Sequence, residues 1–493
     1  MVTLYYMRRY VRFLRQTLGD KDETTEISIE VSHWLDETAK ALAEVRPLLG
    51  GNPISPEQRF ESLAQLGQAA SRCREIVYAQ EGFSGKDTRA LGTITDMLDD
   101  ALVAIDHSIA NNQRENGLYH AYNLLDLEEA TIEVEPLYKM LEGQVAALSA
   151  GSITAQEAVD VLQALFDSDL YRPDQRSFML YPDRELPSFL EKNRIPAEAV
   201  ERSPFLQRML AEGDDRIVAR DADGTFRFNA EFINVGALNA RLDTLVPQFG
   251  DELEASRDAL LELYETVFDH QSFTGRSGGM FGFEGLGCIY WHMVAKLLLA
   301  VQENFFAALD GHEDSDTCHR LGHLYYEVRS GIGFNKTPRE YGAFPTDPYS
   351  HTPGNAGARQ PGMTGQVKEE ILSRFGELGV RVSAGKVRFE PALLRAREFV
   401  TAPRHLRFLD VEGNWQELEV PPATVAFTWC QVPVIYELIS EGKPSLTITL
   451  DTDEQRSFDQ LELPIDESSL LYSRSGRIRQ VWLRLQASAL FAE

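Results

Sequence analysis

Basic residues and cysteines are scarce in this chain of 493 residues, and each shortage excludes classes of function. Lysine and arginine number 48 against 76 acidic residues, so the formal net charge is −28. A surface of that sign repels nucleic acid and anionic membranes, and no basic cluster offsets it. The four cysteines lie far apart without a Cys-x-x-Cys pair. This argues against a disulfide framework or a zinc ribbon and favours a cytoplasmic protein with reduced thiols.

Several familiar signatures are also missing. No apolar run approaches the roughly 18 residues of a membrane-spanning helix, and arginines interrupt the N-terminal segment where a signal peptide needs an apolar stretch. There is no Gly-x-Ser-x-Gly elbow and no Gly-rich phosphate loop ending in Lys-Ser or Lys-Thr. His319 and His323 have the spacing of a shared metal site. Because the glutamate of a His-Glu-x-x-His motif is absent, we expect no metal.

Hydrophobic residues make up 43% of the chain, enough for a folded protein with sizeable cores. Over residues 1–380 they recur at helical spacing, most clearly in 286–309, where one face is apolar at every fourth residue. This predicts about a dozen helices separated by Gly and Pro breakers. The segments expected to be helical are 4–18, 26–46, 56–78, 87–110, 130–149, 154–167, 197–211, 229–246, 251–268, 286–309, 314–330 and 365–376.

After residue 380 the periodicity changes to short stretches rich in β-branched and aromatic residues. Seven or eight strands at this spacing predict a small antiparallel β-sandwich over residues 381–493. The expected strands are 386–389, 406–409, 415–420, 424–429, 434–438, 446–450 and 478–485.

Helices with apolar stripes must bury them against one another. An (α/α)6 toroid of paired inner and outer helices is one closed arrangement that does so, and its inner-helix loops surround a central pit suited to a sugar. We therefore expect a toroid-like catalytic domain over residues 1–380, followed by the β-sandwich domain of residues 381–493.

Two loops rich in Gly, Pro and polar residues flank the helix of residues 286–309, and loops held by a rigid scaffold often carry functional sites. The first contains Asp269, the candidate general acid, beside Phe268 and Phe273. Cleavage of a glycosidic bond needs a proton for the leaving oxygen, and an apolar setting raises the pKa of a carboxyl group. Glu284 is a second candidate catalytic carboxylate, or an acid that favours the N-terminus of the next helix.

The second loop ends in a Thr-Gly pair that opens a helix, where backbone N–H groups attract an anion. An ordinary Thr N-cap is the alternative reading. Upstream, residues 114–123 and 171–184 combine aromatic rings with acids and amides, the mixture that binds a pyranose or forms a buried polar network. The candidate substrate- or phosphate-binding residues of the two loops are His270, Arg276, Tyr341, His351, Arg359, Gln360, Thr364 and Gly365.

The order of these residues resembles the catalytic loop of the cellobiose phosphorylase family. That loop carries an Asp, a Gly-rich stretch and a Gly-x-Glu before a Trp-containing helix, as do Asp269, Gly275–Gly282, Glu284 and Trp291 here. The resemblance implies an (α/α)6 barrel with a C-terminal β-sandwich. It departs from the family at the Asp-Trp-Asn-Asp signature, which reads Asp-His-Gln-Ser from Asp269 onwards.

The same family binds inorganic phosphate through a His and a Thr-Gly pair, to which His351 and Thr364-Gly365 are similar. Residues 379–391 resemble the entry into its C-terminal sandwich. The resemblance thus implies phosphate as a co-substrate and no other cofactor. The family's large N-terminal β-sandwich has no counterpart here, so we expect that an N-terminal domain is missing and that the chain is one piece of a longer enzyme. A homo-oligomer is a separate expectation.

These observations predict a carbohydrate-active enzyme that cleaves or transfers β-linked glucosyl units by phosphorolysis, hydrolysis or transglycosylation. Its partner is an oligosaccharide or polysaccharide, with neither nucleic acid nor membrane. A polysaccharide lyase using Tyr119, His120 and Asn123 is one alternative. A non-catalytic glycan-binding or scaffolding part of a longer polypeptide is another.

Overall fold

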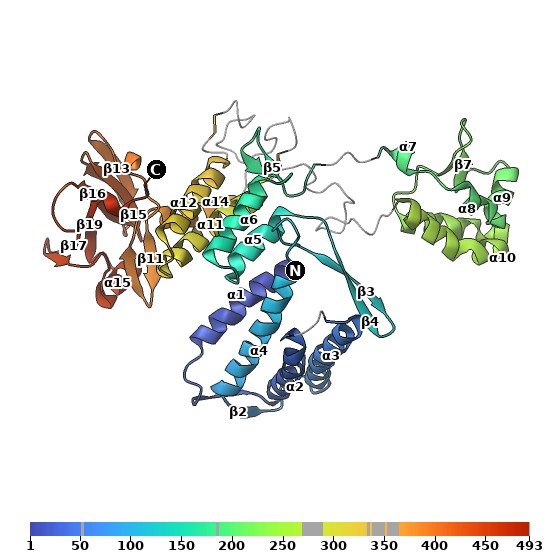
Figure 1. Ribbon diagram of the computed structural model, residues 1–493, viewed down its shortest axis with the longest axis horizontal. Helices are drawn as coiled ribbons and strands as arrows, with labels where there is room; N and C mark the ends of the chain where they lie inside the picture. Colours follow the sequence, from blue (N-terminus) through green and yellow to red (C-terminus); the bar gives the residue numbers. More distant parts are fainter. Residues whose placement is uncertain are drawn as a thin grey trace. The chain divides into compact units, whose positions relative to one another are not determined.

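The computed structural model describes residues 1–50, 54–183, 187–268, 289–332, 336–337, 351–352 and 364–492. The chain forms two compact units (Figure 1). Unit 1 comprises Met1–Tyr181 and Cys288–Glu493, and unit 2 comprises Pro182–Gly287.

The first part of unit 1 alternates helices with β-hairpins. Strands β1 and β2 form an antiparallel pair, and each leads directly into a helix, β1 into α2 and β2 into α4. Strands β3 and β4 form a second antiparallel pair. Helix α3 begins with a capping box, in which Ser55 and Gln58 satisfy each other's backbone N–H groups. The elements are α1 (Val2–Thr17), β1 (Thr24–Ser28), α2 (Ile29–Val45), α3 (Pro56–Ala79), β2 (Lys86–Ala90), α4 (Leu91–Ala110), β3 (Asn123–Glu128) and β4 (Thr131–Pro136).

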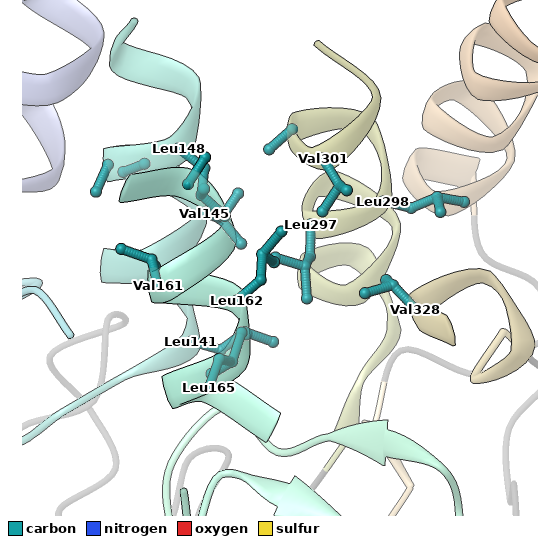
Figure 2. Close-up of a cluster of buried hydrophobic side chains, with 14 of the residues drawn as sticks. Leu141, Val145, Leu148, Val161, Leu162, Leu165, Leu297, Leu298, Val301 and Val328 are labelled. Carbon is teal, nitrogen blue, oxygen red and sulfur yellow. The ribbon is translucent and has the colours of Figure 1, made fainter. Parts of the chain in front are cut away.

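The helices in the middle of unit 1 pack side by side around one hydrophobic core. Helix α11 packs against α5, α6, α12 and α14, and α12 also packs against α6. Figure 2 shows how leucine and valine side chains of α5, α6, α11 and α12 meet. The elements are α5 (Leu141–Ala150), α6 (Ala155–Phe166), β5 (Tyr171–Arg172), β6 (Ser177–Phe178), β9 (Ile289–Tyr290), α11 (Trp291–Asp310), α12 (Ser315–Ser330), β10 (His351–Thr352) and α14 (Thr364–Glu377).

The periodicity of α11 is confirmed by its burial. The five apolar residues recurring every fourth position from Ile289 to Phe305 are all buried, because four described helices, α5, α6, α12 and α14, pack around α11. The paired packing is compatible with a toroid, whose closed ring stays a prediction.

The prediction of a helix over residues 130–149 is wrong in its first half. Residues 131–136 form β4, and α5 begins only at Leu141. Alternation of Thr, Ile, Glu and Val suits a strand as well as a helix, and pairing with β3 decides between them. Likewise, β1 and β2 occupy the starts of the expected helices 26–46 and 87–110.

The C-terminal part of unit 1 is a β-region, and all seven expected strands are present. Its main sheet has the order β15-β16-β19-β17-β18, with β16 and β19 parallel and the other neighbours antiparallel. The pairs β11–β12 and β13–β14 are separate hairpins. The elements are β11 (Val380–Ser383), β12 (Lys386–Phe389), β13 (Arg404–Leu409), β14 (Trp415–Val420), β15 (Thr424–Trp429), β16 (Val432–Ile439), β17 (Ser445–Leu450), β18 (Gln455–Phe458), α15 (Ile465–Tyr472) and β19 (Ile478–Gln486).

Unit 2 has its own core, built by a long helix and a small hairpin. Helix α10 contains Pro247 and a non-helical Gly250, so the two expected helices 229–246 and 251–268 are joined across a kink. Phe205 and Phe249 pack edge to face in this core. The elements are α7 (Phe189–Lys192), α8 (Ala197–Glu201), α9 (Pro204–Ala211), β7 (Val218–Arg220), β8 (Phe226–Phe228) and α10 (Val235–Phe268).

Across the part of the chain that the structure covers, no helix is both long and apolar enough to span a bilayer. Cys73, Cys318 and Cys430 are free thiols.

Candidate functional site

Several loops of unit 1 meet where α5 and α11 begin. The backbone N–H of Leu141, the first residue of α5, donates to Leu180 O over 3.0 Å. Met179 forms a β-bridge with Ile289, just before α11, and Tyr290 pairs with His351. The residues before α5, after α6 and before α11 therefore share one end of the helical core with β10. This end is called the loop end below.

Helix α14 points its N-terminus toward the loop end as well. Leu298 of α11 lines the same cavity as Glu370 and Ile371. About one turn further along, the Gln302 amide donates to Ser373 O over 2.7 Å. Along both helices the residue numbers increase in the same direction, so α14 runs parallel to α11. Thr364 and Gly365, the first residues of α14, therefore lie at the end of the helical core where α11 begins.

The structure places the predicted site residues only in part. His351 lies in β10 beside Tyr290, and Thr364 and Gly365 open α14. The convergence of the candidate catalytic residues stays a prediction. The candidates outside the described residues are Asp269, His270, Arg276, Glu284, Tyr341, Arg359 and Gln360.

The polar stretch of residues 114–123 reaches the loop end through α5. The buried Gln144 amide accepts from Tyr119 N and donates to Tyr119 O, both over 2.8 Å. The Tyr122 hydroxyl donates to Glu142 over 2.8 Å. Burial raises the pKa of Tyr119, whereas burial and the neighbouring Arg114 lower the pKa of His120. Burial and Arg114 therefore both disfavour the charged form of the His120 ring.

The hairpin β5–β6 brings a second polar group to the loop end. Arg172 donates through Nε and Nη2 to Asp174 over 2.9 and 3.0 Å. Its buried Nη1 has no hydrogen-bond partner among the residues the structure describes, and neither has the buried hydroxyl of Ser177. Arg172 and Ser177 are direct cross-strand neighbours. Buried polar groups are normally hydrogen-bonded, so each of these two groups requires a partner beyond the described residues.

Lys336 is a residue that sequence reasoning missed. Its side chain is buried, with the ammonium group 5.0 Å above the Trp291 ring and 3.5 Å from Gln175 Oε1. Lysine is almost never buried unless it is paired. A single lysine between Asn335 and Thr337 gave no signal of this in the sequence, because only the fold brings it to the start of α11.

The loop end thus combines buried cations, tyrosine rings and carboxylates around the starts of parallel helices. Helix N-termini and cations both attract anions, and aromatic rings with acids suit a sugar ring. The arrangement suits a substrate with an anionic and a carbohydrate part.

His319 and His323 have a structural role. Their rings contact each other with centroids 4.8 Å apart, and His319 stacks on Phe491. A His319 ring nitrogen lies 3.1 Å from Ala492 O. Within the described segments, no group of three or more His, Cys, Asp or Glu side chains is arranged to hold a metal ion.

Comparison with known families finds a match within unit 2. Residues 186–271 are similar to the family described as GH149 phosphorylase insertion domain 2. The segment falls inside unit 2, which the structure separates as a compact body. No curated protein matches the chain. The match supports a relationship to glycoside phosphorylases.

Proposed function

We propose that this chain carries the catalytic region of a glycoside phosphorylase-like enzyme that cleaves β-linked glucosyl units with inorganic phosphate. One observation carries the proposal. The segment similar to a phosphorylase insertion domain lies in the chain between Met179 and Ile289, two residues of unit 1 that form a β-bridge at the loop end. The proposal includes the narrower relationship to the cellobiose phosphorylase family that the sequence suggests.

In the proposed reaction a phosphate oxygen attacks the anomeric carbon from the face opposite the glycosidic oxygen. The glycosidic C–O bond breaks, and Asp269 transfers its proton to the departing oxygen. The products are a sugar 1-phosphate of inverted configuration and a shortened oligosaccharide. Glu284 is the second carboxylate of the site, with a role in holding the sugar.

Phosphate as the attacking group is supported by the charges at the loop end. Lys336 is buried beside Trp291, and Arg172 has one buried N–H group without an acceptor among the described residues. A phosphate oxygen would satisfy it. His351 and the Thr364-Gly365 pair at the start of α14 are the proposed phosphate-binding residues, with Arg276, Arg359 and Gln360 from the neighbouring loops. His270 and Tyr341 are proposed to contact the sugar.

Hydrolysis and glycosyl transfer to another sugar use the same scaffold, but no finding favours either one. The lyase and scaffold alternatives draw no support from the comparisons either.

The first test is incubation with a panel of β-glucan oligosaccharides, with and without phosphate. Sugar 1-phosphate and new reducing ends are measured separately. We expect sugar 1-phosphate to form only when phosphate is present. Release of reducing ends at a rate that ignores phosphate would replace phosphorolysis by hydrolysis.

Variants then assign the roles. Asp269→Asn removes the transferable proton and is expected to lower turnover on the order of 10²- to 10⁴-fold, with oligosaccharide binding retained. Asp258→Asn is the matched control, because Asp258 is an exposed carboxylate of α10. Thr364→Val is expected to raise the phosphate concentration needed for half-maximal rate. An Asp269→Asn protein with unchanged turnover would remove Asp269 from the chemistry.

A further inference from the structure

Helix α1 of unit 1 presents large apolar side chains to solvent. Its inner face is buried, as Tyr5 and Val11 show, and packs against α4 and α5. On its outer side Met7, Tyr10 and Phe13 follow at intervals of three residues, so they are neighbours on the helix surface. Their exposed fractions are 49%, 60% and 57%. A single exposed apolar residue is ordinary, whereas a contiguous group of large ones marks an interaction surface.

The same helix is basic, although the chain as a whole is strongly acidic. Residues 2–17 contain four arginines and no aspartate or glutamate, whereas the net charge of the chain is −28. Arg9 pairs with Glu303 over 2.8 Å. Arg12 is exposed and donates to the carbonyl oxygen of Gly151 over 3.2 Å, with no carboxylate partner among the described residues. The outer face of α1 therefore combines apolar side chains with a positive charge.

The antiparallel pair β3–β4 has the opposite charge and is also apolar. Leu125 and Val134 are direct cross-strand neighbours, and Leu127 lies on the same face, two residues further along β3. Their exposed fractions are 53%, 36% and 59%. Residues 123–136 contain no lysine or arginine. The exposed carboxylates of the pair and its turn are Asp126, Glu128, Glu129, Glu133 and Glu135. The pair β3–β4 is called the acidic ribbon below.

The charge of the acidic ribbon restricts what can cover it. Within the described structure the ribbon is a two-stranded sheet with two unpaired outer edges, and exposed edges tend to pair with another strand. Pairing of two such ribbons would bring rows of carboxylates together, and like charges on neighbouring strands are destabilising. A basic apolar surface meets no such repulsion, and every copy of this chain carries one on α1.

We propose that the outer face of α1 docks on the acidic ribbon of a second copy of this chain. The contact is reciprocal, because each copy offers its own α1 to the ribbon of the other, as in a two-fold symmetric dimer. Tyr10 and Phe13 pack against Leu125 and Leu127, and Arg12 faces the carboxylates. Tyrosine and arginine are among the residues that contribute most to such interfaces. This inference is independent of the proposed function.

Sedimentation velocity of the whole chain, from nanomolar to high micromolar concentration, tests the proposal. We expect the wild-type chain to form a dimer as its concentration rises, and salt to weaken the dimer because it screens exposed charges. Tyr10→Ala and Leu127→Ala are each expected to raise the dissociation constant on the order of 10- to 100-fold. Tyr78→Ala is the matched control, because it removes a 75% exposed tyrosine at the end of α3 and is expected to leave the constant unchanged.

Charge reversal tests whether the two surfaces contact each other. Arg12→Glu makes α1 repel the ribbon, and the double variant Asp126→Arg with Glu128→Arg makes the ribbon repel α1. Each variant alone is therefore expected to lose the dimer. An equimolar mixture of the two variants is expected to regain it as a heterodimer, because each α1 then meets a ribbon of opposite charge. All three positions are exposed, so these variants remove no buried group and serve if a truncation fails to fold.

The possible results separate the proposal from its alternatives. A wild-type chain that stays monomeric overturns it, and binding of that monomer to phosphatidylserine vesicles, lost in Tyr10→Ala, would assign the face to a membrane instead. A dimer that the α1 or ribbon variants leave unchanged, or a mixture that does not regain the dimer, also overturns it. None of these measurements uses catalytic activity, so a failure here is distinct from a failure of the proposed function.

Discussion

Gly379 is the residue at which the helical part of unit 1 turns into the β-region. It follows α14 and precedes β11, with φ at +72°. A Cβ atom added there would collide with the carbonyl group of Glu390 and with Pro391 N. Its carbonyl accepts from Glu390 N over 2.7 Å. Both the left-handed conformation and the close backbone contact require glycine.

Replacing Gly379 by alanine is expected to destabilise the protein by clearly more than the roughly 1–2 kcal/mol that a left-handed conformation costs an L-residue. The excess arises because the backbone of Glu390 must move. Gly413 is the matched control, with φ at +83° and open space where a Cβ atom would be added. Urea denaturation gives both free energies of unfolding. Equal losses in the two variants would show that the backbone contact at Gly379 contributes nothing.

Charged side chains join α11 to the hairpin β11–β12. Arg381 of β11 donates to Asp310, at the end of α11, over 2.9 Å and to Glu390 over 2.7 Å. Arg388 of β12 also reaches Asp310. The hydrogen bond from Arg381 is the main reason that the pKa of Asp310 lies below its usual range. The folded state therefore favours the charged carboxylate.

This depressed pKa predicts how stability depends on pH. A carboxyl group with a lowered pKa in the folded state contributes stability above its unfolded pKa, about 3.9. It loses that contribution as pH falls through the lower, folded value. Asp310→Asn is thus expected to be less stable than wild type near pH 6, with the difference shrinking below about pH 4. Denaturation at a series of pH values measures it, with the exposed Asp459→Asn as control. A difference that is constant with pH would refute the linkage.

A second group of charges joins two helices within unit 1. Glu377, 1% exposed at the end of α14, pairs with Arg329 of α12 and with Arg374, and accepts from the Tyr325 hydroxyl over 2.6 Å. Burial is the main reason that the pKa of Tyr325 lies well above its usual range. Three donors offset the free-energy cost of burying the Glu377 carboxylate. Removal of one donor would leave that buried negative charge incompletely compensated and would destabilise the fold.

On the scale of the whole molecule, the two units have separate cores. Leu242 lies in the core of unit 2 and Leu297 in the helical core of unit 1, and both are fully buried. Chains with separate cores commonly unfold in more than one step.

We expect calorimetry to show more than one unfolding transition, and truncation of either leucine to shift a different one. Leu242→Ala and Leu297→Ala each remove the same side chain from a buried site, at a typical cost of about 2–5 kcal/mol. If both variants shift the same single transition, the two units unfold together.

Much of the local structure could be predicted from the sequence. The apolar repeat through Leu297 correctly predicts α11, and the change of periodicity near residue 380 correctly predicts the seven strands. Such patterns work because a helix or strand with one buried face must repeat its apolar residues with its own period. The excess of acidic over basic residues predicts that nucleic acid is not a partner, and this stays a prediction.

Only the tertiary structure decided which distant segments meet. It paired residues 131–136 with β3, set β16 parallel to β19, and separated unit 2 as a compact body. It also brought Lys336 to Trp291. Local sequence does not encode such contacts, because pairing and burial depend on residues far away in the chain. The candidate residues of the two loops were predicted from their chemistry and from a family resemblance, and their convergence stays a prediction.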